Sequence, residues 1–157
     1  MIFIAVLLAV ILAEWKIKNH MEHSMKEGVV REVAGDTILL RKCHNRGVAC
    51  GTFQKHPEAV KWGTAGLILC LTVDFVRSLV KGGHVLTRTG YALVLGGGIS
   101  NLLDRFRQGF VTDYFSFNVK CKKLSRLVFN LADFCVLAGG ILVVLGKAVS
   151  GREKGNR

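Results

Sequence analysis

Four long apolar stretches, separated by segments rich in Lys and Arg, constrain the fold of this chain more than any other feature. They cover about residues 2–20, 58–80, 86–106 and 129–149. A helix of about 20 consecutive apolar residues crosses the hydrocarbon core of a bilayer. The chain is 50% hydrophobic yet carries 22 Lys and Arg residues, which fits apolar spans that alternate with basic loops. We therefore predict one integral-membrane domain over residues 1–157, mainly α and polytopic, with four transmembrane helices.

The first apolar stretch has a second interpretation. Residues 2–13 could form a secretory signal peptide, because Ala9 and Ala13 are small residues of the kind found at cleavage sites. However, no positively charged segment precedes them, and no following segment is expected to fold without them. We interpret residues 2–20 as a transmembrane helix whose interfacial end is marked by Trp15 and Lys16.

Two segments between the apolar stretches have the character of strands. In residues 28–53, Val29–Val33 and Thr37–Arg41 flank a turn. Residues 111–117 alternate and are rich in aromatic side chains. These segments predict a small antiparallel β-sheet. Pro57 predicts the start of the second helix, and residues 120–126 predict a basic, helical connector.

The net charge of +11 predicts an anionic partner. The basic residues flank the apolar stretches, so anionic membrane lipids are expected rather than nucleic acid. By the positive-inside rule, the more basic segments 16–55 and 105–126 would lie in the cytoplasm. That rule weakens over long connections, so the count alone does not fix the topology.

The five Cys and five His residues predict no metal site or cofactor. The Cys residues show no CxxC spacing, and the His residues are dispersed. Cys70 and Cys135 lie inside apolar stretches and are expected to behave as small hydrophobic residues.

Two aspartates, Asp113 and Asp133, lie close to the ends of apolar stretches. An ionisable side chain in a transmembrane segment costs about 2.5–3.5 kcal/mol, so it predicts a functional site. Two neighbouring carboxylates can share one proton and catalyse acid–base chemistry on a peptide bond. The alternative is that each carboxylate pairs with an Arg or caps a helix.

Other polar residues are expected to be structural. Glu14 and Lys18 have the i, i+4 spacing of a helical ion pair, and Asp74 and Arg77 have the i, i+3 spacing. Asp104 is interpreted as structural. Gly96, Gly97 and Gly98 can let another helix or a ligand approach the third helix, and they can leave room for acyl chains.

The order of the polar motifs resembles a known family. The motifs are Glu14 with Lys18, Asn45-Arg46-Gly47-Val48-Ala49, Gly98-Ile99-Ser100-Asn101-Leu102-Leu103-Asp104-Arg105, Gly109-Phe110-Val111-Thr112-Asp113-Tyr114 and Phe129-Asn130-Leu131-Ala132-Asp133. From about residue 8 to residue 149, this pattern is similar to that of the lipoprotein signal peptidase family, also called signal peptidase II. The first motif departs from the family, which usually has Asp followed by Gln where this chain has Glu14 and Trp15. Neither motif that contains Asp113 or Asp133 departs from the family pattern in a way that affects the aspartates.

The resemblance implies a membrane aspartyl endopeptidase with four helices and a small sheet at the outer membrane face. Such enzymes cleave bacterial prolipoproteins on the N-terminal side of a diacylglyceryl-modified Cys. It implies that Asp113 and Asp133 are catalytic, and that the surrounding site residues are Asn45, Gly47, Gly98, Asn101, Arg105 and Asn130. Gly47 is expected to permit a tight turn. The implied location is the bacterial inner membrane, with both termini in the cytoplasm and the site near the outer leaflet, against the charge count.

The chemistry of the residues agrees with this implication. Amide hydrolysis without a metal needs a water, a base and an acid, and two carboxylates sharing a proton supply both. Asn101 and Asn130 can donate hydrogen bonds to a substrate carbonyl or a carboxylate. Arg105 can hold a peptide carbonyl or a lipid head group, or pair with Asp104. Two alternatives stay open: an inactive homologue that binds lipidated peptides, and a membrane scaffold or transporter subunit whose acids line an ion path.

Overall fold

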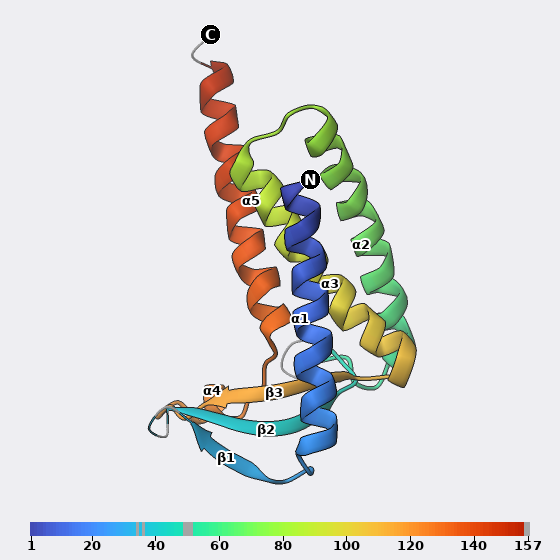
Figure 1. The fold of residues 1–157 in the computed structure, drawn as a ribbon, viewed down its shortest axis with the longest axis vertical. Helices are drawn as coiled ribbons and strands as arrows, with labels where there is room; N and C mark the ends of the chain where they lie inside the picture. The colour runs from blue at the N-terminus through green and yellow to red at the C-terminus, as the bar shows by residue number, and fades with distance from the viewer. Residues whose placement is uncertain (34, 36, 49–51, 156–157) are drawn as a thin grey trace.

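In the computed structural model, the polypeptide forms long helices that lie side by side, with a sheet at one end (Figure 1). The structure describes residues 1–155 except 34, 36 and 49–51. The elements are α1 (Ile2–Ser24), β1 (Val30–Val33), β2 (Ile38–Asn45), α2 (Pro57–Val80), α3 (Val85–Gln108), β3 (Val111–Phe117), the short α4 (Lys122–Ser125) and α5 (Leu131–Gly155). α1 begins and α5 ends at the end of the bundle away from the sheet (Figure 1). The fold is therefore mainly α with a small antiparallel sheet, as predicted.

Each predicted span coincides with one long helix, and the helices are longer than predicted at several ends. At 1.5 Å per residue, helices of this length reach about 35 Å, which exceeds the hydrocarbon thickness of a bilayer. By length and composition, Pro57–Val80 and Leu131–Arg152 are apolar enough to cross a membrane. α1 is as apolar as these two helices on average, but Glu14, Lys16 and Lys18 lie within its span. α3 is less apolar and carries charges toward its ends. The crossing of the membrane by all four helices stays a prediction.

α3 is the central helix of the bundle and packs against α1, α2 and α5. Its Tyr91, Ala92 and Leu95 form a buried core cluster with Phe75 of α2. α3 and α5 pack closely at Gly90, where an added Cβ would lie 2.6 Å from the carbonyl oxygen of Gly139. Small residues of this kind let two membrane helices approach through their backbones.

The sheet has the strand order β1-β2-β3, and both pairings are antiparallel. The predicted second strand was to end at Arg41, but β2 continues to Asn45, which pairs with Val111. The polar residues of this continuation find partners outside the sheet. The amine of Lys42 lies 3.1 Å from the carboxylate of Glu22, and the His44 ring lies 2.8 Å from the same carboxylate. The end of α1 thereby supports the half of β2 that leads to Asn45.

Two connections bring the sheet to the helix ends. Gly109, in the left-handed conformation at φ 82°, ends α3 and turns the chain into β3. After β3, the chain returns to α5 through a segment fixed by Arg41, whose guanidinium donates a 2.9 Å hydrogen bond to the carbonyl of Ser125. The ends of α3 and β3 and the start of α5 therefore lie close together.

Candidate functional site

Asp113 is a buried carboxylate in the middle of β3. It accepts a 2.7 Å hydrogen bond from the amide of Asn130 and a 3.1 Å hydrogen bond from the amide of Asn45. Burial, together with the negative charge of Asp133, raises the pKa of Asp113 to about 7, although both amide hydrogen bonds oppose the shift. This carboxyl can therefore hold or release a proton near neutral pH.

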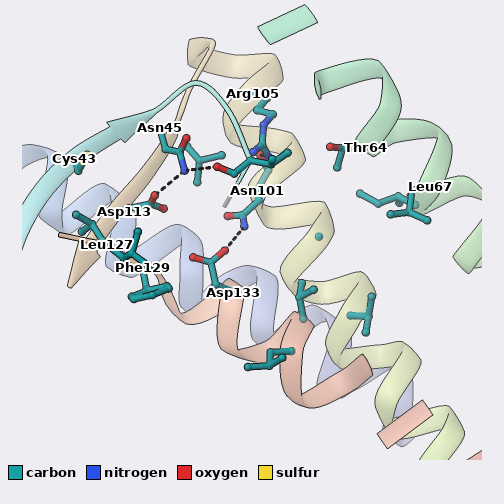
Figure 2. Close-up of a pocket in the computed structure, with 18 of the residues that line it drawn as sticks. Cys43, Asn45, Thr64, Leu67, Asn101, Arg105, Asp113, Leu127, Phe129 and Asp133 are labelled. Carbon is teal, nitrogen blue, oxygen red and sulfur yellow. Dashed lines mark hydrogen bonds between the residues drawn. The ribbon is translucent and has the colours of Figure 1, made fainter. Parts of the chain in front are cut away.

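Asp133 lies in the first turn of α5 and has two roles in the geometry. Its backbone N–H donates to the Asn130 side-chain oxygen at 3.0 Å, and its carboxylate accepts from the Asn130 backbone N–H at 3.1 Å. This reciprocal pair is a capping box, so Asp133 does cap a helix. Its other carboxylate oxygen accepts a 3.2 Å hydrogen bond from Asn101, and Asp133 also lines the main cavity (Figure 2). Capping and a role in the site are compatible here, although the sequence suggested them as alternatives.

A fully buried asparagine joins the two aspartates. Asn130 donates to Asp113, while its backbone N–H and side-chain oxygen both engage Asp133. Its amide nitrogen also lies 3.2 Å from the side-chain oxygen of Asn101. Neither Asn130 nor Gly47 lines the main cavity. Gly47 contributes its backbone carbonyl, which accepts a hydrogen bond from Arg105. Both residues were predicted to contact a ligand, and in the structure they hold other site residues in place.

Lys18 orients the amide of Asn101. The Lys18 amine donates a 2.7 Å hydrogen bond to the side-chain oxygen of Asn101, so the amide nitrogen of Asn101 points to Asp133. The same amine lies 2.9 Å from the carboxylate of Asp104 and 3.4 Å from that of Glu14. The predicted Glu14–Lys18 pair is confirmed, and it extends directly to the site.

Glu14 also fixes the start of α5. Its carboxylate accepts hydrogen bonds from the backbone N–H of Ala132 at 2.6 Å and from the hydroxyl of Tyr114 at 3.1 Å. Tyr114 in turn accepts from the backbone N–H of Leu131 at 2.9 Å. The first amides of α5 lack partners within their own helix, and these side chains supply them. The sequence predicted the pair within α1 but not its contact with α5.

Arg105 holds the turn that follows β2. Its guanidinium donates a 2.7 Å hydrogen bond to the carbonyl of Gly47, and no ion pair joins it to Asp104, which pairs with Lys18. The turn is tight, as predicted, because an added Cβ at Gly47 would collide with the carbonyl oxygen of Thr52. The φ of Gly47 is not positive, so glycine is required for space rather than for a left-handed backbone.

The main cavity has a volume of about 620 Å³ and joins the aspartates to an apolar wall. Of the predicted site residues, Asn45, Gly98, Asn101, Arg105, Asp113 and Asp133 line it. The opposite wall is α2, which contributes Thr64, Leu67, Ile68 and Leu71 (Figure 2). This spacing is one stripe of a helix. The cavity is therefore polar at the sheet end and apolar between the helices.

The three consecutive glycines of α3 have different environments. An added Cβ at Gly96 would lie 2.9 Å from Val10 of α1, and one at Gly97 would lie 2.5 Å from the carbonyl of Ala132. Only Gly98 lines the cavity, where an added Cβ would lie 3.5 Å from Ile68. The suggestion that all three leave room for acyl chains was wrong, because neighbouring helices occupy the space beside Gly96 and Gly97.

A thiol also lies beside the aspartates, since Cys43 pairs with Asp113 in the sheet and lines the cavity. Partial desolvation and the neighbouring Asp113 charge raise the pKa of the Cys43 thiol, which remains accessible. A thiolate is the nucleophilic form of cysteine, and the site disfavours it. The adjacent His44 contacts Glu22 and Glu27 instead of this thiol. The carboxylates are thus better suited to chemistry than Cys43.

The fold and the site define a membrane protein with two linked carboxylates at the polar end of an apolar cavity. Residues 4–148 match the family model described as signal peptidase (SPase) II. A lipoprotein signal peptidase of Mesorhizobium japonicum is 32% identical over 95% of this chain and 86% of its own length, and one of Halothermothrix orenii is 32% identical over 92% and 93%. This chain therefore belongs to the signal peptidase II family of peptidases.

Solved structures support the same fold. A bacterial membrane enzyme superposes with a TM-score of 0.81 at 20% sequence identity, covering 97% of this chain and 90% of that chain. A second bacterial membrane enzyme gives a TM-score of 0.75 at 21% identity, covering 91% and 90%. At this identity the likeness concerns the arrangement of the helices and the sheet.

Proposed function

We propose that this protein is an aspartyl endopeptidase that removes signal peptides from prolipoproteins by cleaving on the N-terminal side of a diacylglyceryl-modified Cys. The observation that carries the proposal is the pair Asp113 and Asp133, linked through Asn130 at the polar end of the cavity. One carboxylate takes a proton from water while the other gives a proton to the leaving amide nitrogen. The proton is shared by the pair, so the roles of base and acid are not assigned to single residues.

The cavity suits a substrate that is part peptide and part lipid. Its polar end offers the amide groups of Asn45 and Asn101 and the guanidinium of Arg105. These donors can bind peptide carbonyl oxygens. Its apolar end, between α2, α3 and α5, can bury apolar side chains and hydrocarbon. The relatives named lipoprotein signal peptidase support this substrate class.

The proposal is tested by cleavage of two synthetic peptides by the purified protein in detergent or lipid. Both carry the same signal sequence and differ only in the Cys, which is diacylglyceryl-modified in one and unmodified in the other. We expect cleavage before the modified Cys and at least about a hundredfold lower turnover of the unmodified peptide, because buried hydrocarbon supplies binding free energy at roughly 0.8 kcal/mol per CH₂. Equal cleavage of both peptides, or of neither, contradicts the proposal.

We further propose that all four long helices cross the inner membrane and that the sheet and the aspartates lie at the outer leaflet. The ends of the bundle are chemically different. The end near the sheet carries a cluster of two aromatic rings and a lysine, formed by Trp62, Phe106 and Lys61. Such clusters are typical of the boundary between hydrocarbon and head groups. Among the described residues, Asp74 lies apart from the other acidic residues of the long helices, and no series of acids links it to Glu14 through the bundle. Asp104, Asp113 and Asp133 cluster near the sheet, which argues against an ion path.

Topology can be measured with two cysteine probes in a Cys-free background. Val33→Cys places an exposed thiol on β1, and Lys81→Cys places one in the turn between α2 and α3. In intact spheroplasts, a membrane-impermeant maleimide should label Val33→Cys and should label Lys81→Cys only after permeabilisation. The reverse pattern would mean that the positive-inside count is right and that the sheet faces the cytoplasm.

A further inference from the structure

A second apolar pocket lies beside the main cavity, at the start of α2. It has a volume of about 370 Å³ and lies between Phe53, in the loop before α2, and the first turns of that helix. Val48, Thr64 and Leu67 line both this pocket and the main cavity. The two spaces therefore meet along α2, and a branched ligand can occupy both at once. We name the second space the α2 pocket.

The lining of the α2 pocket selects for hydrocarbon. Among the described residues that line it, the only polar side chain is that of Thr64, whose hydroxyl donates a 2.7 Å hydrogen bond to the carbonyl of Val60 within α2. A peptide segment would bring backbone N–H and C=O groups that find no partners there, at a cost of about 1–3 kcal/mol for each buried group. An alkyl chain brings none. The volume is near the lower end of the range of small-molecule pockets, which suits one chain.

The position of the pocket matches the depth at which lipid acyl chains begin. Trp62 and Phe106 lie edge to face with their ring centroids 5.5 Å apart. Trp62 is 62% exposed and Phe106 is 50% exposed. The amine of Lys61 lies 5.5 Å from the centroid of the Phe106 ring and pairs with Glu58 at 2.7 Å. Exposed aromatic rings beside a lysine are typical of the boundary between hydrocarbon and head groups. The α2 pocket opens within the same turns of α2.

We propose that the α2 pocket binds one acyl chain of the diacylglyceryl group of the substrate while the main cavity holds the peptide beside Asp113 and Asp133. This inference rests on the proposed function and adds a specificity site to it. The shared wall at Thr64 and Leu67 lets the modified Cys stay near the aspartates while its acyl chain turns around α2. The α2 pocket thus recognises the acyl chain at a place separate from the carboxylates.

Two glycines of α2 provide a matched pair of variants. Gly63 lines the α2 pocket but not the main cavity, and an added Cβ there meets no heavy atom within 4 Å. Gly63→Leu therefore adds an apolar side chain at the wall of the pocket, with its Cβ in open space. Gly66 is equally open, lies in the same helix and lines neither space. Gly66→Leu controls for the gain in helix propensity and for the added apolar surface.

The test compares two peptides that differ only in the length of their acyl chains, C16 and C6, with the full-length protein in vesicles of fixed composition. We expect Gly63→Leu to lower kcat/KM about tenfold for the C16 peptide and less than about twofold for the C6 peptide. The tenfold effect corresponds to the loss of about two buried methylene groups of the long chain. Gly66→Leu should change neither value. Equal effects on both peptides, no effect of Gly63→Leu, or the same effect from Gly66→Leu would overturn the inference.

Direct binding separates this inference from the proposed function. A fluorescent C16-diacylglyceryl peptide is titrated with the wild-type protein and both variants, without any need for cleavage. Weaker binding to Gly63→Leu alone supports the acyl site even if no peptide is cleaved, and that result would disprove only the peptidase function. Equal binding to all three proteins would reject the acyl site even if cleavage is normal.

Discussion

Asp113→Asn and Asp133→Asn should each lower the turnover of a diacylglyceryl-modified peptide by about a thousandfold or more. General acid–base catalysis contributes roughly 10²–10⁴-fold, and each variant leaves one carboxylate without the partner that shares its proton. The replacement keeps the size of the side chain, so the protein should remain folded. Near-normal turnover by either variant would remove that aspartate from the mechanism.

Asp74→Asn is the matched control for charge. Asp74 also carries a carboxylate on a long helix, but it is half-exposed, lies 3.6 Å from Arg77 and does not line the cavity. An exposed pair of this kind contributes about 0–1 kcal/mol to stability. We expect Asp74→Asn to retain wild-type turnover, and thermal unfolding of all three variants in detergent checks that they are folded.

The pH dependence of turnover follows from the same pair. Because the pKa of Asp113 is raised to about 7, its carboxyl keeps a proton below neutral pH and loses it above. Turnover should therefore fall as the pH rises through about 7, when the pair loses its shared proton. The protonated carboxyl stabilises the folded protein fully below about pH 4, and this stabilisation is lost as the pH rises from there through about 7. Turnover that is constant from pH 6 to pH 9 would contradict the shared proton.

The sequence predicted the helices well because their signal is strong and local. Long apolar stretches bounded by Pro57 or by basic residues define a helix almost without reference to the rest of the chain. The strand continuation to Asn45 was missed for the opposite reason. His44 and Lys42 are held by the carboxylate of Glu22, which is some 20 residues away in the sequence. Such support from another element has no local pattern.

The candidate site shows the same division. The motifs around Asp113 and Asp133 identified the carboxylates, and the structure brings their predicted partners Asn45, Asn101 and Asn130 to them. The wall formed by α2 was not predicted. Apolar residues occur all around that helix, so hydrophobic periodicity does not separate the stripe facing the cavity from the surface facing lipid.

Lys18→Met should lower the free energy of unfolding by about 3–5 kcal/mol, the cost of removing one partner from a buried ion pair. The Lys18 amine is buried between the carboxylates of Glu14 and Asp104, and the variant leaves both without it. Turnover should fall as well, because the amide of Asn101 loses the hydrogen bond that orients it toward Asp133. Thermal unfolding and cleavage measured on the same preparation check both effects.

Two further variants decide whether the buried charge is the cause. Lys16→Met removes an exposed lysine from the same helix and should change stability by less than about 0.5 kcal/mol. Adding Glu14→Gln to Lys18→Met should recover part of the loss, because glutamine removes the unpaired charge and its oxygen can still accept from the N–H of Ala132. A double variant as unstable as the sum of both single changes would show that the two residues act independently. In that case, α1 would hold α5 through packing alone, and the charge cluster would not explain how Asp133 is positioned.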